Sequence, residues 1–208
     1  MKKEIVLVGG GGHCKACIDV IETQGEYDIA GIVDIKERIG ESVLGYRIIA
    51  TDDDFQSLVR EYEYFLICIG QIKLLQKRME KFKILKSHGA KFPIIISPLA
   101  YISKHAKLNK GTVVMHNVTV NAYAKIGRNC ILNTASVIEH DAIIKDNCHI
   151  STGAIINGGS IIEENCFVGS NVTTREGIHI GRDSVIGAGL TILRDMPEKT
   201  FLKNMEIG

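Results

Sequence analysis

The 208-residue sequence has no uninterrupted apolar run that approaches the ~20 residues needed to cross a membrane as a helix. It also has no excess of charge of one sign, because 25 Lys and Arg residues are balanced by 24 Asp and Glu residues, for a net charge of +1. The charges are mixed along the chain, without the basic stripe that indicates nucleic acid or an anionic membrane. We therefore predict no membrane span, no membrane partner and no nucleic-acid partner.

The amino terminus carries no recognisable secretion signal. The opening MKKEIVLVGGGGH has a short apolar segment, IVLV, which runs into glycines where a cleavage site would be needed. We therefore expect a cytoplasmic protein, and in that compartment its six cysteines are expected to be reduced thiols.

Cys14 and Cys17 form a C-x-x-C pair, and the sequence has no second pair of this kind. A zinc site of this type needs two pairs, and a redox role needs a thioredoxin-like setting. We therefore interpret the pair as two positions on the first turn of a helix and predict no metal site.

An aliphatic residue recurs at every sixth position from 102 to 192, and Thr174 is the one departure. Neither the 3.6-residue period of a helix nor the alternation of an ordinary strand produces this pattern. Hexapeptide repeats are typical of a parallel β-helix, in which each hexad is a short strand plus a turn. Three hexads then close one triangular coil, so residues 18 apart stack in columns.

Three such columns hold residues suited to tight corners, because Gly, Asn and Asp tolerate a positive φ. They are Gly111, Asn129, Asn147, Asn165 and Asp183; Asn117, Ala135, Gly153, Asn171 and Gly189; and Tyr123, Asp141, Gly159 and Gly177. The unbroken register predicts a prism without a long inserted loop.

In two further columns the side chains are expected to point to the inside of this prism and to its outside. Cys130, Cys148 and Cys166 stack in one inward column and are interpreted as small core residues. An outward column is more apolar than a face left to water should be; its members are Val113, Ile131, His149, Phe167 and Val185. We expect another subunit to cover this face, in a homotrimer in which His149 points toward a neighbouring site.

The first 97 residues are predicted to form an α/β, Rossmann-like unit. Strands are expected at 4–8, 29–34 and 63–70, and helices at 15–23 and 74–89. The Ser-Pro pair at 97–98 ends this unit, so the predicted domains are 1–97 and 98–208.

The loop GGGGH does not match the dinucleotide fingerprint G-x-G-x-x-G, because Cys14 and Lys15 stand where the last glycine is required. Backbone without side chains before a helix N-terminus still allows the close approach of a phosphate or a sugar. Asp34 ends the next strand in the same expected crevice, and we favour a binding role for it over a turn role.

The prism, together with GGGGHCK and NTASVIEHD, resembles the left-handed β-helix acetyltransferases, and among them the nucleotide-sugar acetyltransferases of the bacillosamine pathway with their sialic-acid and perosamine relatives. The resemblance covers essentially the whole chain. It implies a left-handed parallel β-helix after the Rossmann-like unit, and acetyl-CoA as cosubstrate without a metal.

The resemblance also implies roles for particular residues. His140 is the general base and Asp141 raises its basicity. Sugar-nucleotide contacts fall on Gly11, Gly12, His13, Asp34 and Gly70. The acetyl-CoA side comprises Asn133, His149, Gly153, Gly158, Ser170 and Ala188, with the Gly153 N–H as a possible oxyanion donor. The tail FLKNMEIG lacks the proline of many relatives near the CoA site, so contacts there are expected to differ.

The expected function is acetyl transfer from acetyl-CoA to the 4-amino group of a nucleotide-linked amino-deoxy sugar, of the UDP-4-amino-4,6-dideoxy-N-acetylglucosamine type, by direct attack. Alternatives are O-acetylation of sialic or legionaminic acid and N-acetylation of GDP-perosamine. A non-catalytic scaffold is a further alternative. A zinc triad of His116, His140 and His149 within one subunit is disfavoured, because their spacings place them in different columns.

Overall fold

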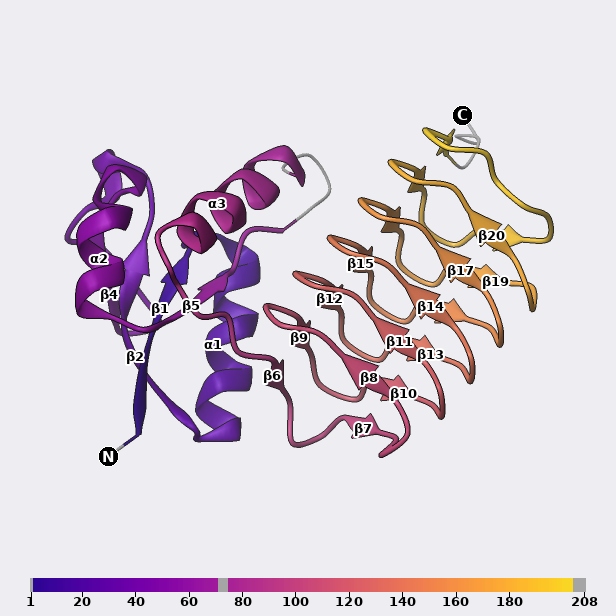
Figure 1. Ribbon diagram of the computed structural model, residues 1–208, viewed down its shortest axis with the longest axis horizontal. Helices are drawn as coiled ribbons and strands as arrows, with labels where there is room; N and C mark the ends of the chain where they lie inside the picture. The colour runs from indigo at the N-terminus through magenta and orange to yellow at the C-terminus, as the bar shows by residue number, and fades with distance from the viewer. Residues whose placement is uncertain (1, 71–74, 204–208) are drawn as a thin grey trace. The chain divides into compact units, whose positions relative to one another are not determined.

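The computed structural model describes residues 2–70 and 75–203, and the chain divides into two compact units between Ile96 and Ser97 (Figure 1). The described part leaves out residues 71–74 and 204–208. The first residue of the predicted helix 74–89 and most of the unusual tail therefore lie outside it. Within the described residues, no helix is both long and apolar enough to cross a membrane.

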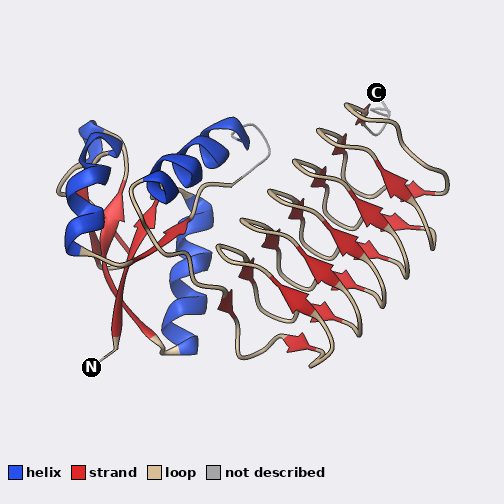
Figure 2. Ribbon diagram, viewed as in Figure 1, coloured by secondary structure: helices blue, strands red, loops and turns tan. Residues whose placement is uncertain are grey.

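The amino-terminal unit is built on a five-stranded sheet of order β3-β4-β2-β1-β5, and helices accompany the sheet (Figure 2). Four strands run parallel, and β3 pairs antiparallel with β4. The strands are β1 (Lys3–Val8), β2 (Tyr27–Val33), β3 (Ser42–Val43), β4 (Tyr46–Ala50) and β5 (Tyr64–Ile67), with a short β6 (Ile95–Ile96) at the end of the unit. The three predicted strands are thus confirmed, and β3 and β4 were not predicted.

Three α-helices accompany this sheet: α1 (Gly12–Gln24), α2 (Phe55–Glu61) and α3 (Leu75–Ser87). Two short 3-10 turns, η1 (Lys36–Arg38) and η2 (Asp52–Asp54), complete the unit. The predicted helices correspond to α1 and α3. The unpredicted α2 follows η2, where Thr51 and Asp54 form a capping box, a start signal that the sequence contained.

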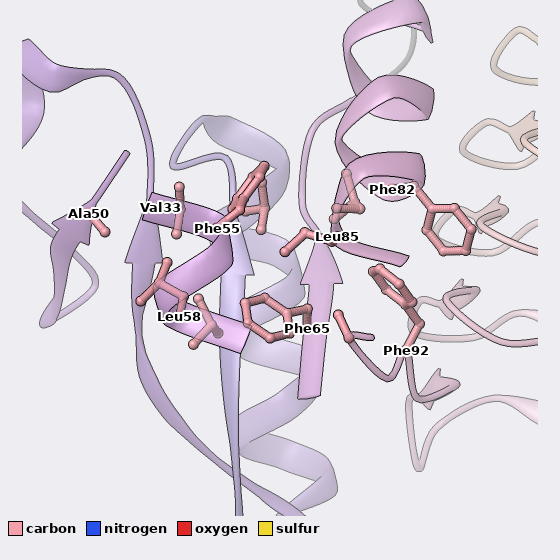
Figure 3. Packing of buried hydrophobic residues seen from close by; sticks show 12 residues of the cluster. Val33, Ala50, Phe55, Leu58, Phe65, Phe82, Leu85 and Phe92 are labelled. Atoms are coloured by element: carbon pink, nitrogen blue, oxygen red, sulfur yellow. The ribbon is translucent and has the colours of Figure 1, made fainter. Parts of the chain in front are cut away.

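The core beside α2 and α3 is aromatic and aliphatic (Figure 3). Phe55 and Leu58 of α2 and Leu85 of α3 pack with Phe65 of β5, and all four are nearly or fully buried. This packing joins α2 and α3 to the sheet, and the same cluster includes Val8, the last residue of β1 before the glycine loop.

The carboxy-terminal unit is a coil of two-residue strands. The strands form three parallel sheets, one on each face of the prism, which we call face D, face E and face C. Face D contains β7 (Tyr101–Ile102), β10 (Thr119–Val120), β13 (Val137–Ile138), β16 (Ile155–Ile156), β19 (Thr173–Thr174) and β22 (Thr191–Ile192). Face E contains β8 (Lys107–Leu108), β11 (Lys125–Ile126), β14 (Ile143–Ile144), β17 (Ile161–Ile162) and β20 (His179–Ile180). Face C contains β9 (Val113–Val114), β12 (Ile131–Leu132), β15 (His149–Ile150), β18 (Phe167–Val168), β21 (Val185–Ile186) and β23 (Phe201–Leu202).

The hexapeptide prediction is confirmed at the level of single residues. The second residue of every strand from β7 to β22 is the residue reached by steps of six from Ile102. Strands 18 residues apart pair in parallel, as Val137 with Ile155 does. Every residue of the three predicted corner columns has a positive φ, from 54° to 75°.

The inside of the prism is packed as predicted. Cys130, Cys148 and Cys166 are free thiols and completely buried. At one corner the asparagine side chains form a ladder, in which Asn129 Nδ2 donates to Asn147 Oδ1 and Asn147 Nδ2 to Asn165 Oδ1, at 2.9 and 3.1 Å. This ladder satisfies polar side chains at positions where a positive φ is needed.

The outward column of face C differs from its prediction. Val113, Ile131, His149 and Phe167 are buried in the single chain, at 0, 0, 5 and 9% exposure, and Val185 is half-buried. Because these side chains are already covered, they do not form an apolar surface that requires a second subunit. This column therefore does not support the homotrimer, which stays a prediction.

Candidate active site

The glycine loop connects β1 to α1 and lines a cavity of about 760 Å³ in the amino-terminal unit. All five predicted sugar-nucleotide residues line this cavity: Gly11, Gly12, His13, Asp34 and Gly70. Nothing lies within 4 Å of the position that a Cβ would take at Gly11 or Gly12. The loop therefore presents bare backbone at the N-terminus of a 13-residue helix, a geometry suited to an anion.

Asp34, directly after β2, is held by the loop and by an arginine. Its Oδ2 accepts a hydrogen bond from the Gly10 N–H at 3.0 Å and one from Arg38 Nη1 at 2.5 Å. A Cβ at Gly10 would lie 2.7 Å from that oxygen, so glycine is required there for the approach. Sequence reasoning missed Gly10 and Arg38, although both belong to this wall of the cavity.

His13 and three thiols lie behind the loop. His13 Nε2 is 3.6 Å from the Cys17 Sγ. Cys14, Cys17 and Cys68 are all buried, and the first two stand in the opening turns of α1, as predicted. Hydrogen bonding from Cys68, opposed by burial, holds the pKa of Cys17 well below its usual value, whereas burial raises that of Cys68. In the described parts of the chain, no group of three or more His, Cys, Asp and Glu side chains is arranged to hold a metal ion.

His140 lies at the corner between faces D and E of the prism. Its Nδ1 is 2.9 Å from Asp141 Oδ2, and both side chains are about two-thirds exposed, at 64 and 63%. A carboxylate oxygen can only accept, so Nδ1 carries the proton and Nε2 is the basic nitrogen. The hydrogen bond to Asp141 raises the pKa of His140, with smaller contributions from Glu139 and Glu176.

The backbone turn at this corner places the Asp141 carboxylate beside the His140 ring. Its φ is 61°, and its N–H donates to the Ala122 carbonyl of the preceding coil at 3.1 Å. Glu139 Oε2 accepts from Asn121 Nδ2 at 2.8 Å and from the His140 backbone N–H at 3.4 Å. The backbone geometry thus selects Asp141 as the hydrogen-bond partner of His140.

Gly158 stands one coil after His140 at the same corner. A Cβ on Gly158 would lie 2.7 Å from Cε1 and 2.8 Å from Nε2 of the His140 ring. The imidazole therefore rests in the space that this glycine leaves open.

The other predicted acetyl-CoA residues lie at the corner between faces C and D or on face C. Asn133 Nδ2 is 3.2 Å from His149 Nε2, and the His149 ring meets Phe167 edge-on at 5.2 Å. Ser170 Oγ is 3.0 Å from Ser151 Oγ, and the Ser170 carbonyl accepts from the Gly189 N–H next to Ala188. Face D separates this group from His140, Asp141 and Gly158, so one prism does not bring the two groups together.

The oxyanion role predicted for Gly153 is contradicted by its hydrogen bonding. The Gly153 N–H donates to the Thr134 carbonyl of the preceding coil at 2.9 Å, as the corner geometry demands. A donor already used inside the prism is not free to hold a developing oxyanion.

Two protein-family models match the chain, one in each unit. Residues 4–82 match the PglD N-terminal domain, and residues 160–194 match the hexapeptide repeat of succinyl-transferase. Over the whole chain, the structure is similar to perosamine N-acetyltransferase from Caulobacter crescentus, with 29% identity and a TM-score of 0.91 over 97% of this chain and 93% of that one. The chain therefore combines a PglD N-terminal domain with hexapeptide repeats, and its structure is similar to that of an N-acetyltransferase with the same organisation.

Two other solved structures are similar to this chain. The acetyltransferase domain of PglB from Neisseria gonorrhoeae FA1090, solved with acetyl coenzyme A, is 28% identical, with a TM-score of 0.89 over 98% of this chain and 97% of that one. WeeI from Acinetobacter baumannii AYE shares the fold at 19% identity, with a TM-score of 0.85 over 96% of each chain. A sequence search of curated proteins found no match. The family resemblance seen in GGGGHCK and NTASVIEHD is therefore confirmed.

Proposed function

We propose that this hexapeptide-repeat acetyltransferase transfers the acetyl group of acetyl-CoA to the 4-amino group of a nucleotide-linked amino-deoxy sugar of the UDP-4-amino-4,6-dideoxy-N-acetylglucosamine type. The observation that carries the proposal is the exposed His140 ring, whose Nδ1 is held by Asp141. This arrangement leaves Nε2 as an accessible base. Two relatives bind the reactants named in their structures, CoA with GDP-perosamine and acetyl coenzyme A.

His140 acts as general base in this reaction. Nε2 takes a proton from the sugar amine as the amine nitrogen forms a bond to the thioester carbonyl carbon. Asp141 stabilises the resulting imidazolium through the bond to Nδ1. The imidazolium then returns the proton as the C–S bond breaks, and CoA leaves as the free thiol. A covalent acetyl-enzyme is not required, and the prism cysteines are buried away from the reaction.

The N–H of Gly158 replaces that of Gly153 in our proposal for the oxyanion. Gly158 adjoins the His140 ring, and its N–H makes no backbone hydrogen bond among those of the described chain. A donor at this place is close to the base and therefore close to the carbonyl that the amine attacks.

The cavity of the amino-terminal unit is proposed to hold the sugar nucleotide. Gly11 and Gly12 offer backbone N–H groups at the N-terminus of α1 to the diphosphate. Asp34, His13 and Gly70 line the remaining cavity, where they are placed to contact the nucleoside. Arg38 keeps the Asp34 carboxylate in a fixed orientation.

A homotrimer is proposed for the assembly, with each site shared by two chains. Face D separates His140 from the predicted acetyl-CoA residues within one chain, and this separation supports the proposal. A second copy can bring one chain's acetyl-CoA residues to the His140 of another; they are Asn133, His149, Ser170 and Ala188. Closed rings satisfy every copy of such a heterologous contact. Co-refolding His140→Ala with Ser170→Trp should restore part of the activity in hybrids. Inactive hybrids that demonstrably contain both chains would show that each chain has a complete site.

The function is tested by following free thiol release from acetyl-CoA with a panel of acceptors. UDP-linked and GDP-linked 4-amino sugars should be compared, the latter because of the perosamine relative. The proposal expects turnover with a UDP-linked 4-amino sugar and none with the matched 4-hydroxy sugar. If only the GDP-linked sugar is turned over, the assignment of UDP as the nucleotide is wrong. If only free sialic acid is turned over, the reaction is O-acetylation and not N-acetylation.

A further inference from the structure

The corner column of His140 contains one residue without a side chain. Ala122, His140, Gly158 and Glu176 follow one another at 18-residue intervals. Gly158 is not among the residues with a positive φ, in contrast to its neighbour Gly159. Because Ala122 and Glu176 occupy the same turn position in other coils, the turn itself accepts a side chain. Glycine at 158 therefore requires another reason than backbone conformation.

The His140 ring supplies that reason. A Cβ on Gly158 would lie 2.7, 2.8 and 3.3 Å from Cε1, Nε2 and Nδ1 of the ring, whereas ordinary carbon contacts begin near 3.4 Å. The imidazole thus lies against the Gly158 backbone, while Asp141 Oδ2 holds Nδ1 at 2.9 Å. The two contacts fix the ring in one orientation although most of the side chain is exposed.

We propose that Gly158 is a positioning residue for His140, which keeps the imidazole on Asp141 by leaving room for the ring. This inference rests on the proposed function, in which His140 is the base. It differs from an acetyl-CoA contact at Gly158, because it assigns the need for glycine to the space beside the ring and not to the cosubstrate.

A methyl group at 158 should displace the ring without damaging the prism. The ring atoms must retreat by about 0.7 Å or more to reach an ordinary contact distance. The ring is the outer end of an exposed side chain, so it can turn into solvent at little cost to the fold. Turning away weakens the bond to Asp141 and moves Nε2, and a misplacement of about 1 Å at a reacting group costs on the order of 10²-fold in rate.

The first test reads the ring directly and needs no activity. The pKa of His140 is measured by NMR titration of the imidazole in wild type, Gly158→Ala and the control Ala122→Ser. The charged groups that act on the ring are Asp141, Glu139 and Glu176. In Gly158→Ala the pKa should fall toward the ordinary histidine value, as the bond to Asp141 weakens. The control adds an atom at the same turn position one coil earlier and should leave the pKa unchanged.

The second test is a double-mutant cycle on turnover. Gly158→Ala should lower kcat by about 10- to 100-fold in the wild-type background, and the acidic limb of its pH–rate profile should move with the NMR pKa. In the His140→Ala background the same substitution should lower kcat by much less than in wild type, because no ring remains to be displaced and the Gly158 N–H is retained. The KM for acetyl-CoA should be unchanged in both backgrounds.

The outcomes separate this inference from the proposed function. An unchanged His140 pKa in Gly158→Ala overturns the positioning role whatever the activity. An equal loss of kcat in both backgrounds also overturns it, and leaves Gly158 with only the oxyanion role of its N–H. A lowered pKa with unaltered turnover supports the positioning of the ring and removes His140 from the mechanism.

Discussion

Glu163 holds together three coils of the prism, and its ionisation should make part of the stability depend on pH. Its Oε2 accepts from Lys145 Nζ at 2.5 Å and its Oε1 lies 3.0 Å from His179 Nε2. Lys145, Glu163 and His179 stand on face E or at its edge, in successive coils. The bond to Lys145, followed by that to His179, lowers the pKa of Glu163 to about 2.

The magnitude follows from linkage. Lowering a carboxyl pKa from 4.5 to about 2 corresponds to at most about 3 kcal/mol at neutral pH, at ~1.36 kcal/mol per pKa unit. The partners Lys145 and His179 are nearly half exposed, so solvent screening reduces the expected value to about 1–2 kcal/mol. Because the folded pKa is depressed, this stability is present above the unfolded pKa and is lost as the pH falls from about 4.5 to about 2.

The assay is denaturant unfolding of wild type and Glu163→Gln at several pH values. Circular dichroism is the appropriate probe, since the chain has no tryptophan. The variant should be less stable by about 1–2 kcal/mol at pH 7, and the difference should vanish near pH 2. Glu164→Gln is the matched control. The ion pair between Glu164 and Arg182 is long, at 3.9 Å, so the substitution should lower the free energy of unfolding only a little. A difference between wild type and Glu163→Gln that is constant with pH would refute the electrostatic explanation.

Three further predictions concern single positions. Tyr123 has a φ of 61° and is 64% exposed, so Tyr123→Asn should raise the free energy of unfolding by about 1 kcal/mol; a lower Tm would contradict this. A Cβ at Gly169 would lie 2.6 Å from the Ala188 nitrogen, so Gly169→Ala should destabilise the prism by about 1–3 kcal/mol, and an unchanged unfolding midpoint would show that the backbone relaxes. A Cβ at Gly12 meets no atom within 4 Å, so Gly12→Val should raise the KM for the sugar nucleotide and leave that for acetyl-CoA unchanged; equal effects on both would argue against the division of binding between the two units.

The prism was predictable because its rule is local and repeated. Each hexad places one aliphatic residue inside, and each corner needs a positive φ, so a period of six and a column spacing of 18 were both visible in the sequence. Even Tyr123 and Ala135, which are poor residues for a positive φ, follow the column rule. The repeated geometry overrides the preference of a single side chain.

The parts that could not be predicted depend on contacts between residues distant in the sequence. The repeat places Gly153 at a corner, but only the hydrogen bond to Thr134 shows that its N–H is used. The burial of the apolar column on face C was not predicted, because the hexad pattern shows only that these side chains point outward. Likewise, Gly10 and Arg38 become part of the cavity only when β2 brings Asp34 beside the loop.

The central claim is that His140 removes the proton from the sugar amine, and His140→Ala tests it most directly. With an accepted nucleotide sugar, kcat should fall by about 10²- to 10⁴-fold, while the Kd for acetyl-CoA and the Tm should match wild type. His88→Ala, which replaces an exposed histidine after α3, should leave turnover unchanged. If His140→Ala retains wild-type turnover across the pH range, the base lies elsewhere and the mechanism proposed for this corner of the prism is wrong.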